Sequence, residues 1–183
     1  MKTFKPIVSV YLSCVLASPV FAQGNTFTKV RYNGGSVASK VDPKDWDNKL
    51  TVSSDVIVLE LKGPKKHWDK VEIPSKSVTG LSYGQEAHRR VGTMIALAVL
   101  VAPLALFGLF HKTKLHYIGV NYTLADGKSG GILLQGDKSN YRAMLVALQG
   151  VANVPVSVSE KERSSVPVSV RSTVAKETTE EKK

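Results

Sequence analysis

The stretch that decides the fold is His116–Leu148, HYIGVNYTLADGKSGGILLQGDKSNYRAMLVAL. Its first residues alternate between two sets of side chains, and one set consists of His116, Ile118, Val120, Tyr122 and Leu124. Because successive side chains of a strand point to opposite faces of a sheet, this set is expected to share one face. Asp126-Gly127 is a favoured two-residue hairpin turn, so the residues GGILLQ after it are predicted to return as the partner strand.

A helix is predicted to follow this hairpin, from about residue 138 to residue 149. Asp137 is of a type that caps helix starts, and Gly150 is of the type that ends helices. The spacing of apolar residues predicts one buried helical face. That face consists of Tyr141, Met144, Leu145, Leu148 and Ala152.

The residues before this region carry the pattern of short antiparallel strands. A first strand is predicted over residues 26–32. A hairpin is predicted over KLTVSSDVIVLELKG (49–63), and two more strands at KVEIP (70–74) and SVTGLSYG (77–84). The expected fold class is therefore α+β: a small antiparallel β-barrel or sheet with one C-terminal amphipathic helix and an inserted apolar helical segment.

The inserted segment is Gly92–Phe110, a run without any charged residue. As a helix it would reach roughly 28 Å, close to the ~30 Å hydrocarbon thickness of a bilayer. Its basic flanks are predicted to lie at the membrane interface: His88, Arg89, Arg90, His111, Lys112 and Lys114. The apolar anchor is predicted to consist of Met94, Ile95, Leu97, Val99, Leu100, Val101, Pro103, Leu104, Leu106, Phe107, Leu109 and Phe110.

Three arrangements of this run are open. A single span would put the strands before and after it on opposite sides of the bilayer and leave open sheet edges on both. A dip or hairpin would bend near Pro103, which breaks helices, and would return both ends to one side. The third arrangement is a helix packed on the sheet. Basic residues at both ends give no orientation, and the small residues in the run leave homo-oligomer contacts open.

The chain ends suggest the remaining boundaries. Residues 1–22 have the pattern of a signal peptide, with Lys2 and Lys5 before an apolar stretch and Val20-Phe21-Ala22 at the cleavage position. Residues 23–91 and 111–153 are expected to be two portions of one domain, separated by the insertion 92–110. Residues 154–183 are predicted to be a disordered tail, although VPVSV occurs in them twice, at 154–158 and 166–170.

Location and charge narrow the class of partner. The signal peptide predicts an exported, membrane-associated protein of the bacterial cell envelope, with the periplasmic side favoured. The formal net charge of +10 suits anionic lipid headgroups. Export argues against nucleic acid, which is the other common partner of a basic protein.

No pattern in the sequence predicts catalysis. Signal cleavage would remove Cys14, the only cysteine, and with it any thiol nucleophile. Lysine and arginine accompany the histidines of the apolar run, and their positive charge opposes a bound cation, so no metal is predicted. GKSGG lacks the spacing of a phosphate-binding loop. We therefore expect no catalytic residues, no cofactor and no enzymatic activity.

Two stretches resemble a known family. WDNKLTVSSDVIVLELKG (46–63) with KVEIPSKSVTGLSYG (70–84) resembles a recurring pattern of bacterial PH-like domains, which belong to the pleckstrin-homology/GRAM superfold. In those domains a strand–turn–strand hairpin precedes I-P-x-x-x-[IV]-x-x-[IL], represented here by Ile73, Pro74, Val78 and Leu81. Residues 116–148 are similar to the closing hairpin and helix of the same domains, so the resemblance covers about residues 26–152.

The resemblance implies a binding or adaptor module that is often membrane-associated and is without enzymatic activity. Lipid-binding eukaryotic members cluster Lys and Arg around the first hairpin, whereas Lys29, Arg31, Lys40 and Lys44 are loosely spaced here. The expected function is therefore a non-enzymatic PH-like adaptor of the cell envelope that contacts anionic headgroups and a protein partner. The alternative is a soluble carrier of a lipid or another apolar ligand, with the apolar segment as its lid.

Overall fold

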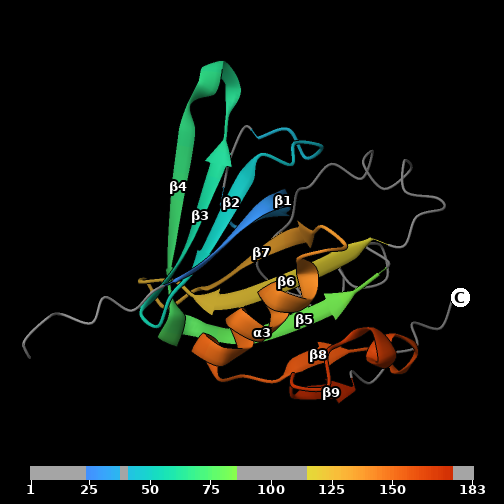
Figure 1. Ribbon diagram of the computed structural model, residues 1–183. Helices are drawn as coiled ribbons and strands as arrows, with labels where there is room; N and C mark the ends of the chain where they lie inside the picture. Colours follow the sequence, from blue (N-terminus) through green and yellow to red (C-terminus); the bar gives the residue numbers. More distant parts are fainter. Residues whose placement is uncertain (1–23, 38–40, 86–114, 175–183) are drawn as a thin grey trace, which may run out of the picture.

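One large sheet dominates the computed structural model, which describes residues 24–37, 41–85 and 115–174. Nine strands lie in the order β4-β3-β2-β1-β7-β6-β5-β8-β9 (Figure 1). Most neighbours are antiparallel, and β4 and β9 form the two edges, so the sheet of the described residues is not closed. The sheet-rich fold with few helices agrees with the predicted class, whereas a closed barrel is not what forms.

The first four strands form an antiparallel meander. They are β1 (Asn25–Gly35), β2 (Asn48–Val52), β3 (Val56–Lys62) and β4 (Trp68–Pro74). The alternation in β3 is confirmed, because Ile57, Leu59 and Leu61 are fully buried while their neighbours are half-buried. The short 3-10 turns η2 (Pro64–Lys66) and η3 (Ser75–Ser77) flank β4.

The next three strands lie on either side of the apolar run in the sequence. The strand before it is β5 (Val78–Gly84), and the strands after it are β6 (His116–Thr123) and β7 (Ser129–Gly136). Ile118, Val120 and Tyr122 lie in the core as the alternation predicts, but Leu124 lies beyond the end of β6 and is 37% exposed. The predicted hairpin forms, but its turn is longer than the predicted two residues, because the backbone N–H of Leu124 donates to the carbonyl oxygen of Lys128 and encloses residues 125–127. Gly127 in this turn has a φ of 81°, which glycine adopts without strain.

β1 connects the two groups of strands. Its first residues pair with β2 and its later residues pair with β7, and the register is irregular between Phe27 and Val30. Lys29 lies at this irregularity with a φ of 57°, as in a β-bulge that bends a strand. As a result, side chains from before and after the apolar run share one hydrophobic core.

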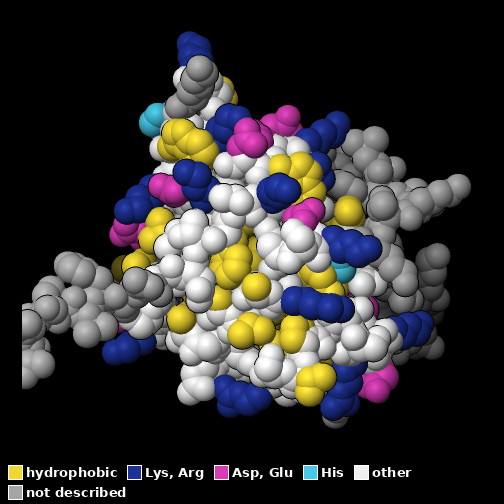
Figure 2. Space-filling view, in the orientation of Figure 1, with side chains coloured by type: hydrophobic (Ala, Val, Ile, Leu, Met, Phe, Trp, Pro, Cys, Tyr) yellow, Lys and Arg dark blue, Asp and Glu magenta, His cyan; other side chains and the backbone are white. Residues whose placement is uncertain are grey.

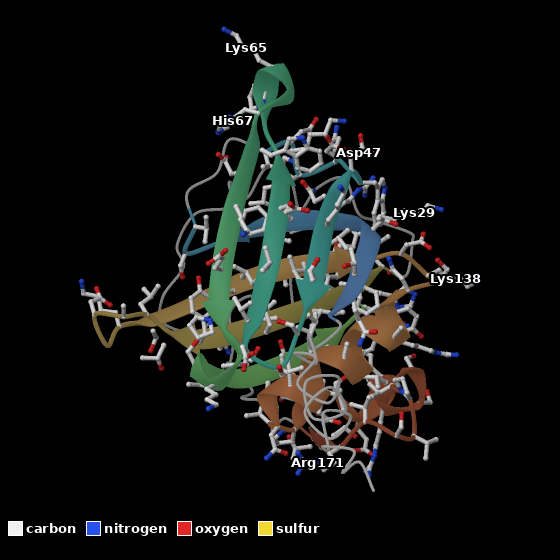
Figure 3. All side chains as sticks on the ribbon, turned by 60° about the vertical axis from the view of Figure 1, so that its left-hand side comes forward. Lys29, Asp47, Lys65, His67, Lys138 and Arg171 are labelled. Carbon is white, nitrogen blue, oxygen red and sulfur yellow. The ribbon has the colours of Figure 1, made fainter. Side chains whose placement is uncertain are left out.

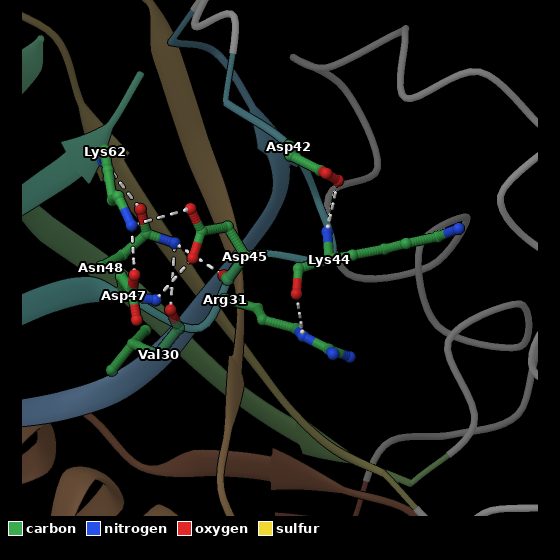
Figure 4. Close-up of polar contacts among 8 residues, drawn as sticks. All are labelled: Val30, Arg31, Asp42, Lys44, Asp45, Asp47, Asn48 and Lys62. Atoms are coloured by element: carbon green, nitrogen blue, oxygen red, sulfur yellow. Dashed lines mark hydrogen bonds and ion pairs between the residues drawn. The ribbon is translucent and has the colours of Figure 1, made fainter. Parts of the chain in front are cut away.

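A buried asparagine holds the first strands in register (Figure 4). The side-chain amide of Asn48 donates to the carbonyl oxygens of Val30 (3.0 Å) and Asp45 (3.1 Å). Its side-chain oxygen accepts from the backbone N–H of Lys62 at 2.9 Å. Asn48 is fully buried, so these three hydrogen bonds satisfy a polar group that would otherwise destabilise the core.

The helix α3 (Tyr141–Ala152) begins three residues later than predicted. The Asp137 carboxylate accepts from the backbone N–H of Ser139, which closes a turn before the helix, and Asn140 takes the cap position. The helix also runs past Gly150 and ends at Ala152, followed by the cap residue Asn153 in the left-handed conformation (φ 55°). Four of the five residues predicted for the buried face are confirmed, namely Tyr141, Met144, Leu145 and Leu148, whereas Ala152 is half-buried.

The structure differs from the predicted tail at residues 154–174. β8 (Val156–Val158) pairs in parallel with β5, and β9 (Ser172–Val174) pairs in parallel with β8, with the 3-10 segment η5 (Glu160–Ser165) between them. Val156 and Val158 are fully buried. These residues complete the core, so the prediction of disorder is wrong for them, and residues 175–183 lie outside the described ranges.

Candidate functional site

The two flanks of the apolar run meet in the sheet. Gly84, at the end of β5, pairs with Tyr117 at the start of β6, and Tyr83 pairs with Ile118. Paired residues of antiparallel strands lie about 5 Å apart. The chain therefore leaves the sheet before residue 86 and re-enters it after residue 114 at neighbouring positions. Strands on opposite sides of a bilayer could not form this pairing.

An aromatic stack lies directly at this point. The Tyr83 hydroxyl and Nδ1 of His116 are hydrogen-bonded at 2.8 Å. The His116 ring stacks on the Tyr141 ring with 3.7 Å between ring centroids and 4° between planes. The Tyr83 and Tyr141 rings are also stacked, at 5.6 Å. The stack joins the end of β5, the start of β6 and the first turn of α3, and we call Tyr83, His116 and Tyr141 the aromatic base.

The C-terminal segment closes around the aromatic base. The backbone N–H of Gln85 donates to the Glu162 carboxylate, and the Gln85 side-chain amide donates to Oγ of Ser165 at 3.2 Å. The Tyr141 hydroxyl donates to the Ser165 carbonyl oxygen at 3.1 Å. Gln85 is the last described residue before the apolar run, and its hydrogen bonds to Glu162 and Ser165 hold this point of the chain against η5.

Burial shifts the pKa of two groups of the aromatic base, His116 and Tyr83, toward their uncharged forms. Burial lowers the pKa of His116 below its usual value, and the nearby positive charge of Arg142 lowers it further. Burial raises the pKa of Tyr83 to about 12. The Arg142 guanidinium donates through Nε to the Tyr141 hydroxyl at 2.9 Å. The hydrogen bonds and the stacked rings together fix the relative positions of β5, β6 and α3 at this point.

Polar side chains lie on the opposite face of the same strands. Gln135 in β7 pairs with Arg31 in β1 on one side and with Tyr117 in β6 on the other. Gln135 is 1% exposed and Tyr117 is 4% exposed, yet Oε1 of Gln135 and the Tyr117 hydroxyl have no hydrogen-bond partner in the described structure. The Arg31 guanidinium lies 4.0 Å from the centre of the Trp46 ring. This face is therefore polar where the core face is apolar.

All the site residues predicted from the sequence fall within residues 86–114, outside the described ranges. This holds for the basic flanks and for every residue of the predicted apolar anchor. Over the ranges that are described, no helix combines the length and apolar character needed to cross a bilayer. Nor do these ranges contain three or more His, Cys, Asp or Glu side chains placed to hold a metal ion.

The contacts within the aromatic base were not predicted from the sequence. The alternation in β6 placed His116 on the core face, and the helical spacing placed Tyr141 on a buried face, but neither pattern indicates that the two rings touch. The usable sequence feature was the position of His116 and Tyr83 at the strand ends that flank the insertion, since hairpin partners face each other there.

Comparisons with known proteins give a distant structural likeness. No family model matches the chain, and no curated protein matches it. Among solved structures, the fold is similar to the hSac2 domain from human phosphoinositide phosphatase Sac2, with a TM-score of 0.46 and 11% sequence identity over 96% of each chain. A likeness of this degree carries no argument about function.

Proposed function

We propose that this protein is a non-enzymatic, membrane-associated binding module of PH-like architecture in the cell envelope. In this proposal the segment 92–110 dips into one leaflet and anchors the domain, and the sheet with α3 presents a surface to a protein partner. The sheet-rich fold is consistent with PH-like architecture. The observation that carries the proposal is the pairing of Gly84 with Tyr117, because it returns both flanks of an uncharged, membrane-length run to one place.

The sequence of the run favours the dip over a helix packed on the sheet. Gly92–Phe110 carries no charged residue and has the length of a membrane segment, and Pro103 near its middle breaks helices. On the core face, α3 already packs against the apolar side chains of the sheet. A bilayer gives an uncharged run of this length an apolar environment.

Deletion of the run tests the anchor. We expect a chain without residues 92–110 to remain folded and to stay in solution without detergent, because the strands that flank the run pair with each other. The measurement is fractionation with and without detergent, together with circular dichroism. A deletion variant that is found only as an unfolded aggregate would instead show that the run is part of the core.

Two further measurements keep the test decisive. The double variant Leu100→Glu/Leu104→Glu leaves the chain length unchanged and should weaken membrane binding, since charged residues are costly in the hydrocarbon region. The unmodified protein should stay with membranes in high salt and in carbonate. Its release under those conditions would contradict an anchor and support a soluble carrier.

A further inference from the structure

Lys29 lies at a sharp corner of the fold. Figure 3 shows β1 turning at Lys29, with Lys138 close by on the same side of the molecule. The two are held together through Asn140, whose side-chain amide donates to the carbonyl oxygen of Thr28 at 2.6 Å and more weakly to that of Lys29 at 3.4 Å. The start of α3 is therefore fixed against the bend of β1, and both lysine side chains are exposed.

Arg142 extends this positive region toward the aromatic base. Its Nε donates to the Tyr141 hydroxyl at 2.9 Å, and the Tyr141 ring stacks on His116 at the start of β6. The charges of Arg142 and Lys138 both lower the pKa of His116, in agreement with this placement. Figure 2 shows Lys and Arg side chains on this face of the molecule. We call Lys29, Lys138 and Arg142 the basic corner.

The basic corner keeps an excess of positive charge. Asp137 is the acidic residue next to Lys138 in the chain, and hydrogen bonds from Ser139, together with the charge of Lys29, lower its pKa. The basic corner therefore contains three positive side chains beside this one acidic residue. Among the described residues, none of the three cations forms an ion pair, whereas Lys62, Lys70 and Lys128 each pair with a carboxylate. Unpaired cations grouped in this way favour an anionic partner.

The position of the basic corner indicates which partner this is. Arg142 contacts Tyr141, whose ring stacks on His116, and the chain enters β6 at His116 directly after the apolar run. A surface next to the exit of a membrane anchor lies at the height of the lipid headgroups. Lys and Arg side chains near an anionic membrane surface strengthen binding about fivefold each.

We propose that the basic corner binds the anionic headgroups of phospholipids and so fixes which side of the domain rests on the bilayer. This inference rests on the proposed membrane anchor and adds a lipid class and an orientation to it. In this orientation the start of α3 lies at the membrane surface. The tip of the β3–β4 hairpin at Lys65 extends away from the basic corner (Figure 3). This tip is therefore accessible to a protein partner.

Vesicle binding of the full chain tests the proposal. The protein is diluted from detergent into preformed vesicles of phosphatidylcholine, or of phosphatidylcholine with phosphatidylglycerol, and the bound fraction is measured by flotation. Lys29→Gln/Lys138→Gln/Arg142→Gln should reduce the preference for anionic vesicles about a hundredfold at low salt. The matched control Lys65→Gln/Lys76→Gln/Lys128→Gln removes the same charge from exposed positions elsewhere and should keep the preference.

Each outcome separates the corner from the anchor. If the unmodified protein binds both vesicle types equally, the membrane anchor is supported and headgroup binding by the basic corner is contradicted. If it binds only anionic vesicles, headgroup binding by the basic corner is supported and the membrane anchor is contradicted. Binding to neither vesicle type would contradict both proposals. An equal loss in the two triple variants would show that total charge matters rather than this surface. Circular dichroism confirms that each variant is folded.

Discussion

Tyr83 and Tyr117 lie on neighbouring strands but point to opposite faces of the sheet. The Tyr83 hydroxyl is hydrogen-bonded to His116 and accepts a second, longer bond from the Gln85 amide at 3.4 Å. The Tyr117 hydroxyl is buried as well, but has no hydrogen-bond partner within the described ranges. The two residues therefore provide a matched pair in which the same atom is removed from different surroundings.

We predict opposite effects for the two phenylalanine substitutions. Tyr83→Phe leaves Nδ1 of His116 without its partner and should lower the free energy of unfolding by about 1–2 kcal/mol. Tyr117→Phe removes a hydroxyl that is buried without compensation, and should leave the free energy of unfolding unchanged or raise it by about 1 kcal/mol. Urea denaturation in detergent solution measures both. A loss at Tyr117 equal to that at Tyr83 would contradict this description of the outer face.

The two copies of VPVSV show that the same element of sequence can take two structures. In the first copy Val156 is fully buried in β8, whereas the corresponding residue of the second copy, Val168, is fully exposed. The first copy lies beside β5, and this long-range pairing decides its structure. A local sequence pattern contains no information about such a neighbour, which is why β8 was predicted as part of a disordered tail.

The repeat supplies its own control for a stability measurement. Val156→Ala should lower the free energy of unfolding by about 2 kcal/mol, because it leaves a cavity between β8 and the core. Val168→Ala makes the same chemical change at an exposed position and should alter it by less than about 0.5 kcal/mol. Both are measured by urea denaturation. Equal effects would mean that residues 154–174 do not pack as described.

Local patterns predicted the other elements well where one face is buried. The alternation of Ile57, Leu59 and Leu61 predicted a strand correctly, and so did the pattern around Ile118 and Val120. The start of α3 was misplaced because Asp137 can either cap a helix or close a turn, and here it closes a turn. Side-chain contacts between distant elements, including the aromatic base, depend on topology and were not predictable from periodicity.

At the scale of the whole molecule, the order of the strands determines what the apolar run can do. β5 and β6 are adjacent in the sheet although about thirty residues separate them, and the core contains side chains from both sides of the gap. Residues 86–114 must therefore begin and end next to each other, beside the end of β5 and the start of β6. This constraint is independent of the identity of a lipid or a partner.

The most direct test of this account is the accessibility of two exposed turns in intact cells. Single cysteines are placed at Ser54, in the β2–β3 turn before the apolar run, and at Lys128, in the β6–β7 turn after it, in a chain with Cys14→Ser. Labelling with a maleimide that does not cross the inner membrane is compared before and after permeabilisation. The account predicts equal labelling of both sites under each condition. Labelling of one site in intact cells, with the other reached only after permeabilisation of the inner membrane, would contradict it.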